Sequence, residues 1–308
     1  MAAIPEDRRV PFTVIGGYLG AGKTTLLNQL LRENDGMRLA VIVNDFGDIG
    51  IDADLIVGHE GDTINLTNGC ICCTISDGLV NVLDDLHRRA DHIDHVVVEA
   101  SGVSDPVRIG HYAGPFGFEL RGVIVLADAE QIRRQVGDKY VGDTVISQLC
   151  GADIVLLTKT DLVDGDQLIE VRRRLDDLVP GATVVDAPFG QLPKAVVLGE
   201  FEPTTRADDR PPVHAIGYDT WHVMASEPIE RRSLDAFVDA LPLGVLRVKG
   251  FVQLADDPEH RFVLQVVGRR ATVVRGDPWN GEVPGTRLVV IGKPGTLAGA
   301  RSAGMMLH

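Results

Sequence analysis

The chain has 308 residues and a formal net charge of −14, with 44% apolar residues and 5% aromatic ones. This length suffices for one large domain and a smaller one. The acidity argues against a duplex-binding or membrane-surface protein, because both need clustered Lys and Arg, so we expect neither nucleic acid nor a membrane as a partner.

The N-terminus and the cysteines bear on the cellular compartment. Residues 1–10 lack the apolar core of a secretion signal, and no apolar run reaches the ~18 residues that a membrane helix needs. Three of the four cysteines fall within four positions, which is a poor framework for disulfide bonds. We therefore expect a cytoplasmic protein whose thiols bind metal or undergo redox chemistry.

The N-terminal part of the chain alternates short apolar strands with amphipathic helices. We predict strands at residues 10–15, 39–43, 64–66, 96–98, 122–126, 154–157 and 183–185. We predict helices at residues 23–32, 75–89 and 168–178. This alternation indicates parallel βαβ units with right-handed connections, so the fold class is α/β with a mostly parallel sheet.

The pattern changes after residues 200–212, a polar and proline-rich stretch typical of a linker. Beyond it we predict one clear helix at residues 233–241. The strands that we predict there lie at residues 213–223, 246–254, 262–267, 272–275 and 287–291. The sequence thus predicts an α/β domain at residues 1–199 and a smaller α+β domain at residues 213–308.

Residues 17–24, GYLGAGKT, match the P-loop pattern G-x-x-x-x-G-K-[ST] between a predicted strand and a predicted helix. Glycines let backbone N–H groups turn toward phosphate oxygens, and the helix N-terminus adds partial positive charge. Lys23 can reach the β- and γ-phosphates, and the Thr24 hydroxyl can bind Mg²⁺. The alternative is a glycine-rich turn without a ligand. The nucleotide-binding residues that we expect here are Gly17, Gly20, Ala21, Gly22, Lys23, Thr24 and Thr25.

Acidic residues after two other strands are candidates for the hydrolysis site. Glu99 ends an apolar strand, and with a P-loop upstream we expect it to hold Mg²⁺ or position water rather than to be a cap or a surface residue. Asp45 and Asp48 follow the strand at residues 39–43 and are candidates for a nucleotide-sensing loop. The predicted catalytic residues are Lys23, Glu99 and Asp45.

A third motif, T-K-T-D, follows the predicted strand at residues 154–157. Asp161 can accept hydrogen bonds from N1–H and the exocyclic amine of guanine, a pair that adenine does not offer. The aliphatic stem of Lys159 can lie over the base. The alternative is an exposed turn that starts the next helix. We assign Thr158, Lys159 and Asp161 to guanine recognition.

Cys70, Cys72 and Cys73 precede the helix predicted from residue 75. If the chain turns into the helix at Cys73, the three sulfurs converge, and the helix N-terminus favours thiolates. Three thiolates suit Zn²⁺, Co²⁺ or another soft ion, and an incomplete ligand set leaves an open position for transfer. The alternatives are a redox sensor and buried, inert thiols. Burial as a small hydrophobic side chain is what we expect of Cys150.

Together these motifs resemble the CobW-like GTPases, a family of P-loop metallochaperones and metal-cofactor insertion factors. The matching segments are residues 16–25 (GGYLGAGKTT), 43–52 (VNDFGDIGID), 68–73 (NGCICC), 99–106 (EASGVSDP) and 158–161 (TKTD). Residues 247–250 (RVKG) are the best match in a C-terminal domain that fits more loosely.

The resemblance implies a GTPase that binds GTP, GDP and Mg²⁺ through its P-loop, with Glu99 near the Mg²⁺ and the γ-phosphate. It implies that Lys159 and Asp161 read guanine and that residues 44–52 form a switch loop. It also implies that the three clustered cysteines hold Zn²⁺ or a similar ion.

The sequence departs from the family pattern in three ways. Asp45 replaces the usual Glu, and Thr158 replaces the usual Asn, which would weaken base selectivity. Residues 200–212 contain no histidine, whereas many relatives have a His-rich tract near the linker, so bulk metal storage is disfavoured.

We therefore expect a nucleotide-gated carrier with slow intrinsic turnover, whose C-terminal domain recognises a client metalloenzyme. The alternatives are an activator of one metalloenzyme such as a nitrile hydratase, a P-loop kinase or ATPase with a structural zinc, and a thiol-oxidation sensor. The sequence leaves open whether the chain forms a homodimer.

Overall fold

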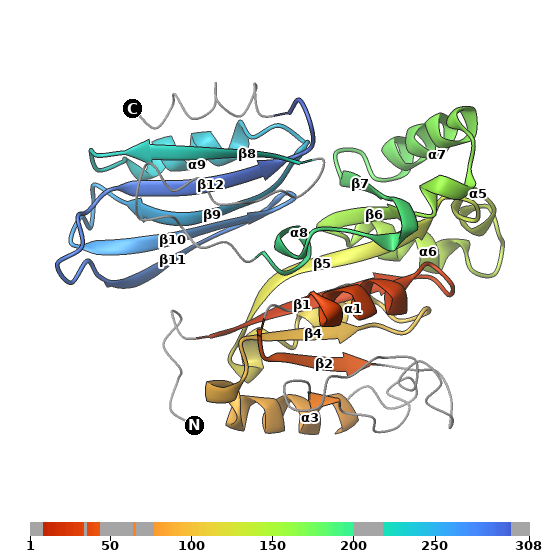
Figure 1. The fold of residues 1–308 in the computed structure, drawn as a ribbon, viewed down its shortest axis with the longest axis horizontal. Coiled ribbons are helices and arrows are strands. Elements are labelled where there is room, and N and C mark those ends of the chain that lie inside the picture. Colours follow the sequence, from red (N-terminus) through yellow and green to blue (C-terminus); the bar gives the residue numbers. More distant parts are fainter. Residues whose placement is uncertain (1–8, 34–35, 44–63, 66–76, 200–217, 297–308) are drawn as a thin grey trace. The chain divides into compact units, whose positions relative to one another are not determined.

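The computed structural model describes residues 9–33, 36–43, 64–65, 77–199 and 218–296 (Figure 1). The chain divides into two compact units, one running from Arg9 to Leu198 and the other from Gly199 onward. The linker predicted at residues 200–212 lies outside the described residues, so the proposed domain limits stay a prediction.

The first unit is built on a seven-stranded sheet in the order β3-β2-β4-β1-β5-β6-β7. Every neighbouring pair in this sheet is parallel. The strands are β1 (Val10–Gly17), β2 (Leu39–Val43), β3 (Ile64–Asn65), β4 (His95–Glu99), β5 (Phe118–Asp128), β6 (Ile154–Thr158) and β7 (Thr183–Ala187). The central strands are buried on both faces, which explains their unbroken apolar runs. The predicted parallel α/β fold is confirmed.

Helices cover both faces of this sheet (Figure 1). The α-helices are α1 (Lys23–Arg32), α3 (Asp77–Arg88), α4 (Pro106–Gly110), α5 (Ile132–Val136), α6 (Gly142–Cys150), α7 (Gly165–Leu178) and α8 (Lys194–Leu198). Shorter 3₁₀ turns are η2 (Ala90–His92), η3 (Gly114–Phe116), η4 (Thr160–Leu162) and η5 (Pro188–Gly190). One large apolar core packs α3, α4, α5, α6 and α7 against the strands. Four buried leucines of α1 face the sheet as well.

Two details of this unit differ from the sequence-based expectations. Strand β5 begins at Phe118, four residues before the predicted start at Gly122. Its pairing with β1 shifts register between Leu120 and Gly122, where Gly122 adopts a φ of 155°, so a bulge divides the strand and hides its first part from a periodic pattern. Cys150 is exposed, so its expected burial is wrong. It is the last residue of α6, and it lies past the helix face that buries Val145 and Leu149.

The second unit is a five-stranded antiparallel sheet in the order β11-β10-β9-β12-β8. Its strands are β8 (Asp219–Ala225), β9 (Val245–Gln253), β10 (His260–Val267), β11 (Arg270–Pro278) and β12 (Thr286–Gly292), and its helix is α9 (Arg231–Asp239). Leu234 and Phe237 of α9 are fully buried in its apolar core. The predicted antiparallel α+β architecture is confirmed.

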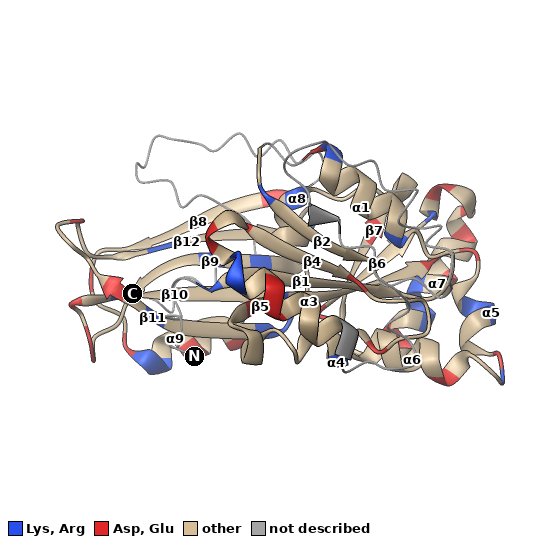
Figure 2. Cartoon of the chain, turned by 90° about the horizontal axis from the view of Figure 1, so that it is seen from below, with Lys and Arg blue, Asp and Glu red and all other residues tan. Residues whose placement is uncertain are grey.

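Figure 2 shows acidic and basic residues interspersed over the helices, with both signs of charge on α7. Among the described helices, none has the length and apolar character needed to cross a membrane.

Candidate functional site

The carboxyl ends of the parallel strands bring the sequence-predicted motifs to one edge of the first sheet. Strand β1 lies between β4 and β5, and β6 and β7 follow on the β5 side. The chain turns back across β1 to add strands on either side of it, and open α/β sheets bind ligands at the crevice where the strand order reverses. The P-loop, Glu99 and the T-K-T-D motif all begin where these strands end.

The P-loop follows β1 and wraps the N-terminus of α1. Gly17 has a φ of 132°, and a Cβ there would lie 2.5 Å from the backbone oxygen of Leu126, so only glycine fits. Gly22, the residue before α1, is left-handed with a φ of 98°. The first turn of α1 contains no acidic residue, so the positive end of the helix dipole is unopposed. This geometry favours an anion at the loop.

Lys23 is the first residue of α1, and its side chain folds back over the loop. The residue is 8% exposed, and its Nζ donates hydrogen bonds to the carbonyl oxygens of Gly17 at 3.0 Å and Tyr18 at 3.4 Å. Thr24 is partly exposed and Thr25 is exposed in the same turn. The ammonium and the Thr24 hydroxyl therefore lie close together, where the P-loop enters α1.

Glu99 is the last residue of β4, the strand that pairs with β1. It is 3% exposed and lies level with Ile15 of β1, two residues before the P-loop begins at Gly17. The next residue donates its backbone N–H to the Ile15 carbonyl at 2.8 Å, which fixes the exit of the chain from β4. A carboxylate at this position suits the second magnesium partner that the sequence predicts, because Mg²⁺ takes oxygen ligands.

Thr158 connects the end of β6 to the P-loop. It is 1% exposed, and its hydroxyl lies 2.8 Å from the Ala21 carbonyl oxygen and 3.2 Å from the Ala127 carbonyl oxygen. The side chain thus ties the start of the T-K-T-D motif to the phosphate loop, a contact that the sequence pattern does not reveal.

The remaining T-K-T-D residues lie at an exposed corner of the same edge. Lys159 has a φ of 57°, and its ammonium pairs with the buried carboxylate of Asp128, the last residue of β5, at 2.5 Å. Asp161 is exposed, and one of its carboxylate oxygens accepts the backbone N–H of Phe189 at 3.0 Å. Phe189 belongs to the turn after β7, is 69% exposed and has a φ of 58°. This corner therefore presents an exposed carboxylate that the Phe189 N–H helps to orient.

Two of these residues were missed in the sequence. Asp128 ends the apolar run of β5 just as Glu99 ends that of β4, so the same reasoning would have found it. Phe189 carries no sequence signal, because its place beside Asp161 depends on the contact between η4 and η5.

Several predicted site residues lie outside the described residues, namely Asp45, Asp48, Cys70, Cys72 and Cys73. Within the described part of the chain, no three His, Cys, Asp or Glu side chains gather closely enough to hold a metal ion. The thiolate site therefore remains a prediction from the cysteine motif.

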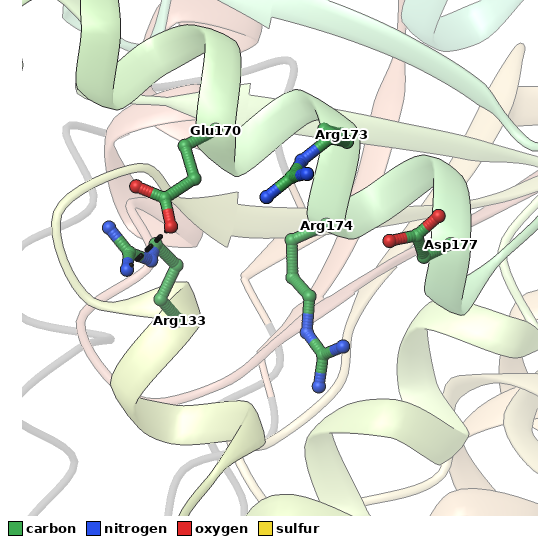
Figure 3. A pocket seen from close by; sticks show the side chains of 5 residues that line it. All are labelled: Arg133, Glu170, Arg173, Arg174 and Asp177. Atoms are coloured by element: carbon green, nitrogen blue, oxygen red, sulfur yellow. Dashed lines mark ion pairs between the residues drawn. The ribbon is translucent and has the colours of Figure 1, made fainter.

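A separate cavity of about 330 Å³ lies between α5 and α7 (Figure 3). Its lining consists of charged side chains, and Arg133 pairs with Glu170 at 2.8 Å. Arg173, Arg174 and Asp177 complete the lining. None of the predicted nucleotide or metal residues belongs to it.

Comparison with known proteins places the chain in a family. The family model described as CobW/HypB/UreG, nucleotide-binding domain, matches residues 11–186, and the model for the cobalamin synthesis protein cobW C-terminal domain matches residues 218–301. The chain is 33% identical to the zinc chaperone CobW of a Sinorhizobium species, with 92% of this chain and 93% of the relative covered.

Two further relatives are similar over nearly their whole length. The zinc chaperone CobW of Pseudomonas aeruginosa is 32% identical, with 92% of this chain and 88% of the relative covered. The zinc chaperone YjiA of Escherichia coli is 31% identical, with 92% of this chain and 94% of the relative covered. The chain belongs to the CobW family, with the nucleotide-binding domain and the C-terminal domain of that family in the expected order.

Proposed function

We propose that this GTPase couples GTP hydrolysis to the delivery of zinc, held by Cys70, Cys72 and Cys73, to a client metalloenzyme. The observation that carries the proposal is the joint placement of the P-loop, Glu99 and the T-K-T-D corner at one sheet edge, in a chain whose relatives are named zinc chaperones. Different residues support the nucleotide chemistry and the binding of the metal cargo.

The phosphates of GTP fit the P-loop. Backbone N–H groups from Gly20 to Thr24 and the Lys23 ammonium would contact the β- and γ-phosphates. Thr24 and Glu99 supply the hydroxyl and carboxylate oxygens that would hold Mg²⁺, whose charge offsets the negative charge developing on the transferred phosphoryl group. Hydrolysis breaks the bond between the γ-phosphorus and the bridging oxygen while water forms the new P–O bond. We assign orientation of that water to Glu99 or Asp45.

Guanine fits the exposed corner at the T-K-T-D motif. Its Watson–Crick edge carries one acceptor, O6, beside two donors, N1–H and the exocyclic amine. The Asp161 carboxylate, whose Oδ1 also accepts the Phe189 N–H, would accept hydrogen bonds from both donors of guanine, whereas adenine presents an amine and an unprotonated nitrogen instead. The Thr158 hydroxyl keeps the motif tied to the P-loop, so the replacement of the usual Asn leaves base and phosphate recognition linked.

Zinc is the proposed cargo because the three relatives similar over 92% of the chain are each named a zinc chaperone. Three thiolates form a partial zinc site, and the position left open permits transfer. We assign recognition of the client to the second unit. A relative of Schizosaccharomyces pombe, 32% identical over 59% of this chain, is named a zinc-regulated GTPase metalloprotein activator, which supports the narrower variant of activating a single metalloenzyme.

The test measures GTP and ATP hydrolysis and zinc content for the wild-type protein and three variants. Lys23→Ala should lower kcat for GTP on the order of 100-fold, because it removes a charge aimed at the reacting phosphates. Lys139→Ala is the matched control, since Lys139 is an exposed lysine that contacts the Tyr140 ring. Cys72→Ser should lose zinc and keep GTP hydrolysis. Preference for ATP, or full zinc content in Cys72→Ser, would contradict the proposal.

A further inference from the structure

Gln148 lies on α6, outside the P-loop, the T-K-T-D motif and the cysteine motif. Its side chain nevertheless contacts the turn that follows Glu99. Its side-chain amide is buried, with 2% of the residue exposed. The Nε2 group donates hydrogen bonds to the carbonyl oxygens of Gly102 at 3.2 Å and Ser104 at 2.8 Å. One side chain therefore fixes two carbonyl groups of the turn between β4 and α4.

The burial of this amide has a free-energy cost that packing alone does not explain. The helix neighbours Val145 and Leu149 are buried in the apolar core. The Oε1 atom of Gln148 is buried too, and it accepts no hydrogen bond from the described residues. A buried polar atom without a hydrogen bond is destabilising, so an apolar side chain would suit this core position better on packing grounds. The two bonds from Nε2 are what the glutamine contributes.

The turn that Gln148 holds lies against the P-loop. A Cβ on Gly102 would lie 2.5 Å from the Leu19 Cδ2 atom and 2.9 Å from the Leu19 backbone nitrogen. The two chain segments are therefore in direct contact, and Leu19 belongs to the P-loop itself. The Ser101 and Ser104 hydroxyls, 2.6 Å apart, close the turn internally. Displacement of this turn would change the position of the chain directly after Glu99, where it contacts the P-loop.

We propose that Gln148 is a positioning residue for GTP hydrolysis, which holds the turn at residues 101–104 in place beside the P-loop. The inference rests on the proposed function, since it assigns a role in that reaction. Gln148 acts through the turn and does not touch the nucleotide. GDP lacks the γ-phosphate on which Glu99 is proposed to act, and Gln148 forms none of the described contacts of the T-K-T-D corner. The residue should therefore affect kcat and leave GDP affinity unchanged.

The test compares Gln148→Met with Gln253→Met in the full-length protein. Methionine keeps the length of the side chain and removes both Nε2 donors. Gln253 is the matched control, because it is a buried glutamine of the second unit whose Nε2 donates to the Pro258 carbonyl at 3.1 Å. Gln148→Met should lower kcat for GTP on the order of 10-fold, since a misplacement of about 1 Å can cost about 100-fold and the turn keeps its other contacts. Its Kd for GDP should stay within about twofold of wild type.

A second variant keeps the proposal testable if Gln148→Met does not fold. Gln148→Asn retains the amide but is one methylene shorter, so it should lower kcat while preserving more of the turn. An unchanged kcat in either folded variant refutes the role of Gln148 alone. Equal losses in kcat and in GDP affinity also refute it, because they indicate a general structural effect. Lack of GTP hydrolysis by the wild-type protein refutes the proposed function, and the role of Gln148 with it.

Discussion

Replacement of Thr158 by valine tests the connection between base recognition and the P-loop. Valine has nearly the same shape as threonine but lacks the hydroxyl group, so the change removes the one donor that the Ala21 and Ala127 carbonyl oxygens share and little else. Thr158 is 1% exposed, so water cannot readily replace the lost donor.

The expected magnitude follows from these contacts. A typical net hydrogen bond contributes about 1 kcal/mol, and a buried carbonyl left without its donor costs about 1–3 kcal/mol. The free energy of unfolding of the first unit should therefore fall by about 1–3 kcal/mol. Loss of the tie to Ala21 also lets the P-loop move relative to the base site, and if about 1.4 kcal/mol of that free energy acts on nucleotide binding, GDP affinity falls about 10-fold.

The assay is GDP binding by titration calorimetry, combined with urea unfolding of the same protein. Thr158→Ser restores the hydroxyl and should bind GDP like wild type. Thr286→Val is the control in the second unit, where the Thr286 hydroxyl is equally buried and accepts the Gln253 N–H at 3.2 Å. A Thr158→Val protein that binds GDP within about twofold of wild type would refute the proposed coupling of base site and P-loop.

Three further substitutions test the turn beside the P-loop, a partly exposed ion pair and the cysteine motif. Gly102→Ala should lower GTP turnover strongly, as measured by steady-state kinetics, because the added Cβ overlaps Leu19. Gly165→Ala is the control and should leave turnover unchanged, because no heavy atom lies within 4 Å of the added Cβ. Hydrogen bonding to Arg38 lowers the pKa of Asp94, so the pair stabilises the fold above the ordinary Asp pKa and this stabilisation is lost as the pH falls through the pKa of the folded state. Asp94→Asn should therefore reduce the loss of folding stability that wild type shows below pH ~4. The effect is below ~1 kcal/mol because the pair is partly exposed, and urea midpoints at several pH values measure it. Cys72→Ser should lower the zinc content per chain, determined by elemental analysis, while GTP turnover persists.

Apolar periodicity and glycine spacing were enough to predict the architecture of both units. The parallel strands of the first sheet are buried on both faces, so they appear in the sequence as unbroken apolar runs, and Lys23–Arg32 has the bounds predicted for the first helix. The P-loop could be located because its glycines are needed for backbone geometry that other residues rarely adopt.

The parts that the sequence did not predict depend on contacts between distant segments. Helices α4 and α5 have five residues each, too few to produce a periodic pattern. Gln148 lies 46 residues after its partner Gly102, and Phe189 lies 28 residues after Asp161. Such contacts follow from the order of the strands in the sheet, which brings together loops that are remote along the chain.

Zinc titration of the protein in two nucleotide states shows whether nucleotide binding controls zinc binding. The protein would be loaded with GDP or with a non-hydrolysable GTP analogue, and zinc affinity measured by competition with a chelator. Zinc affinity should differ between the two states. Because coupling free energies are reciprocal, zinc binding should change the ratio of GTP-analogue affinity to GDP affinity by the same factor. Equal zinc affinities in the two states would contradict a nucleotide-gated carrier.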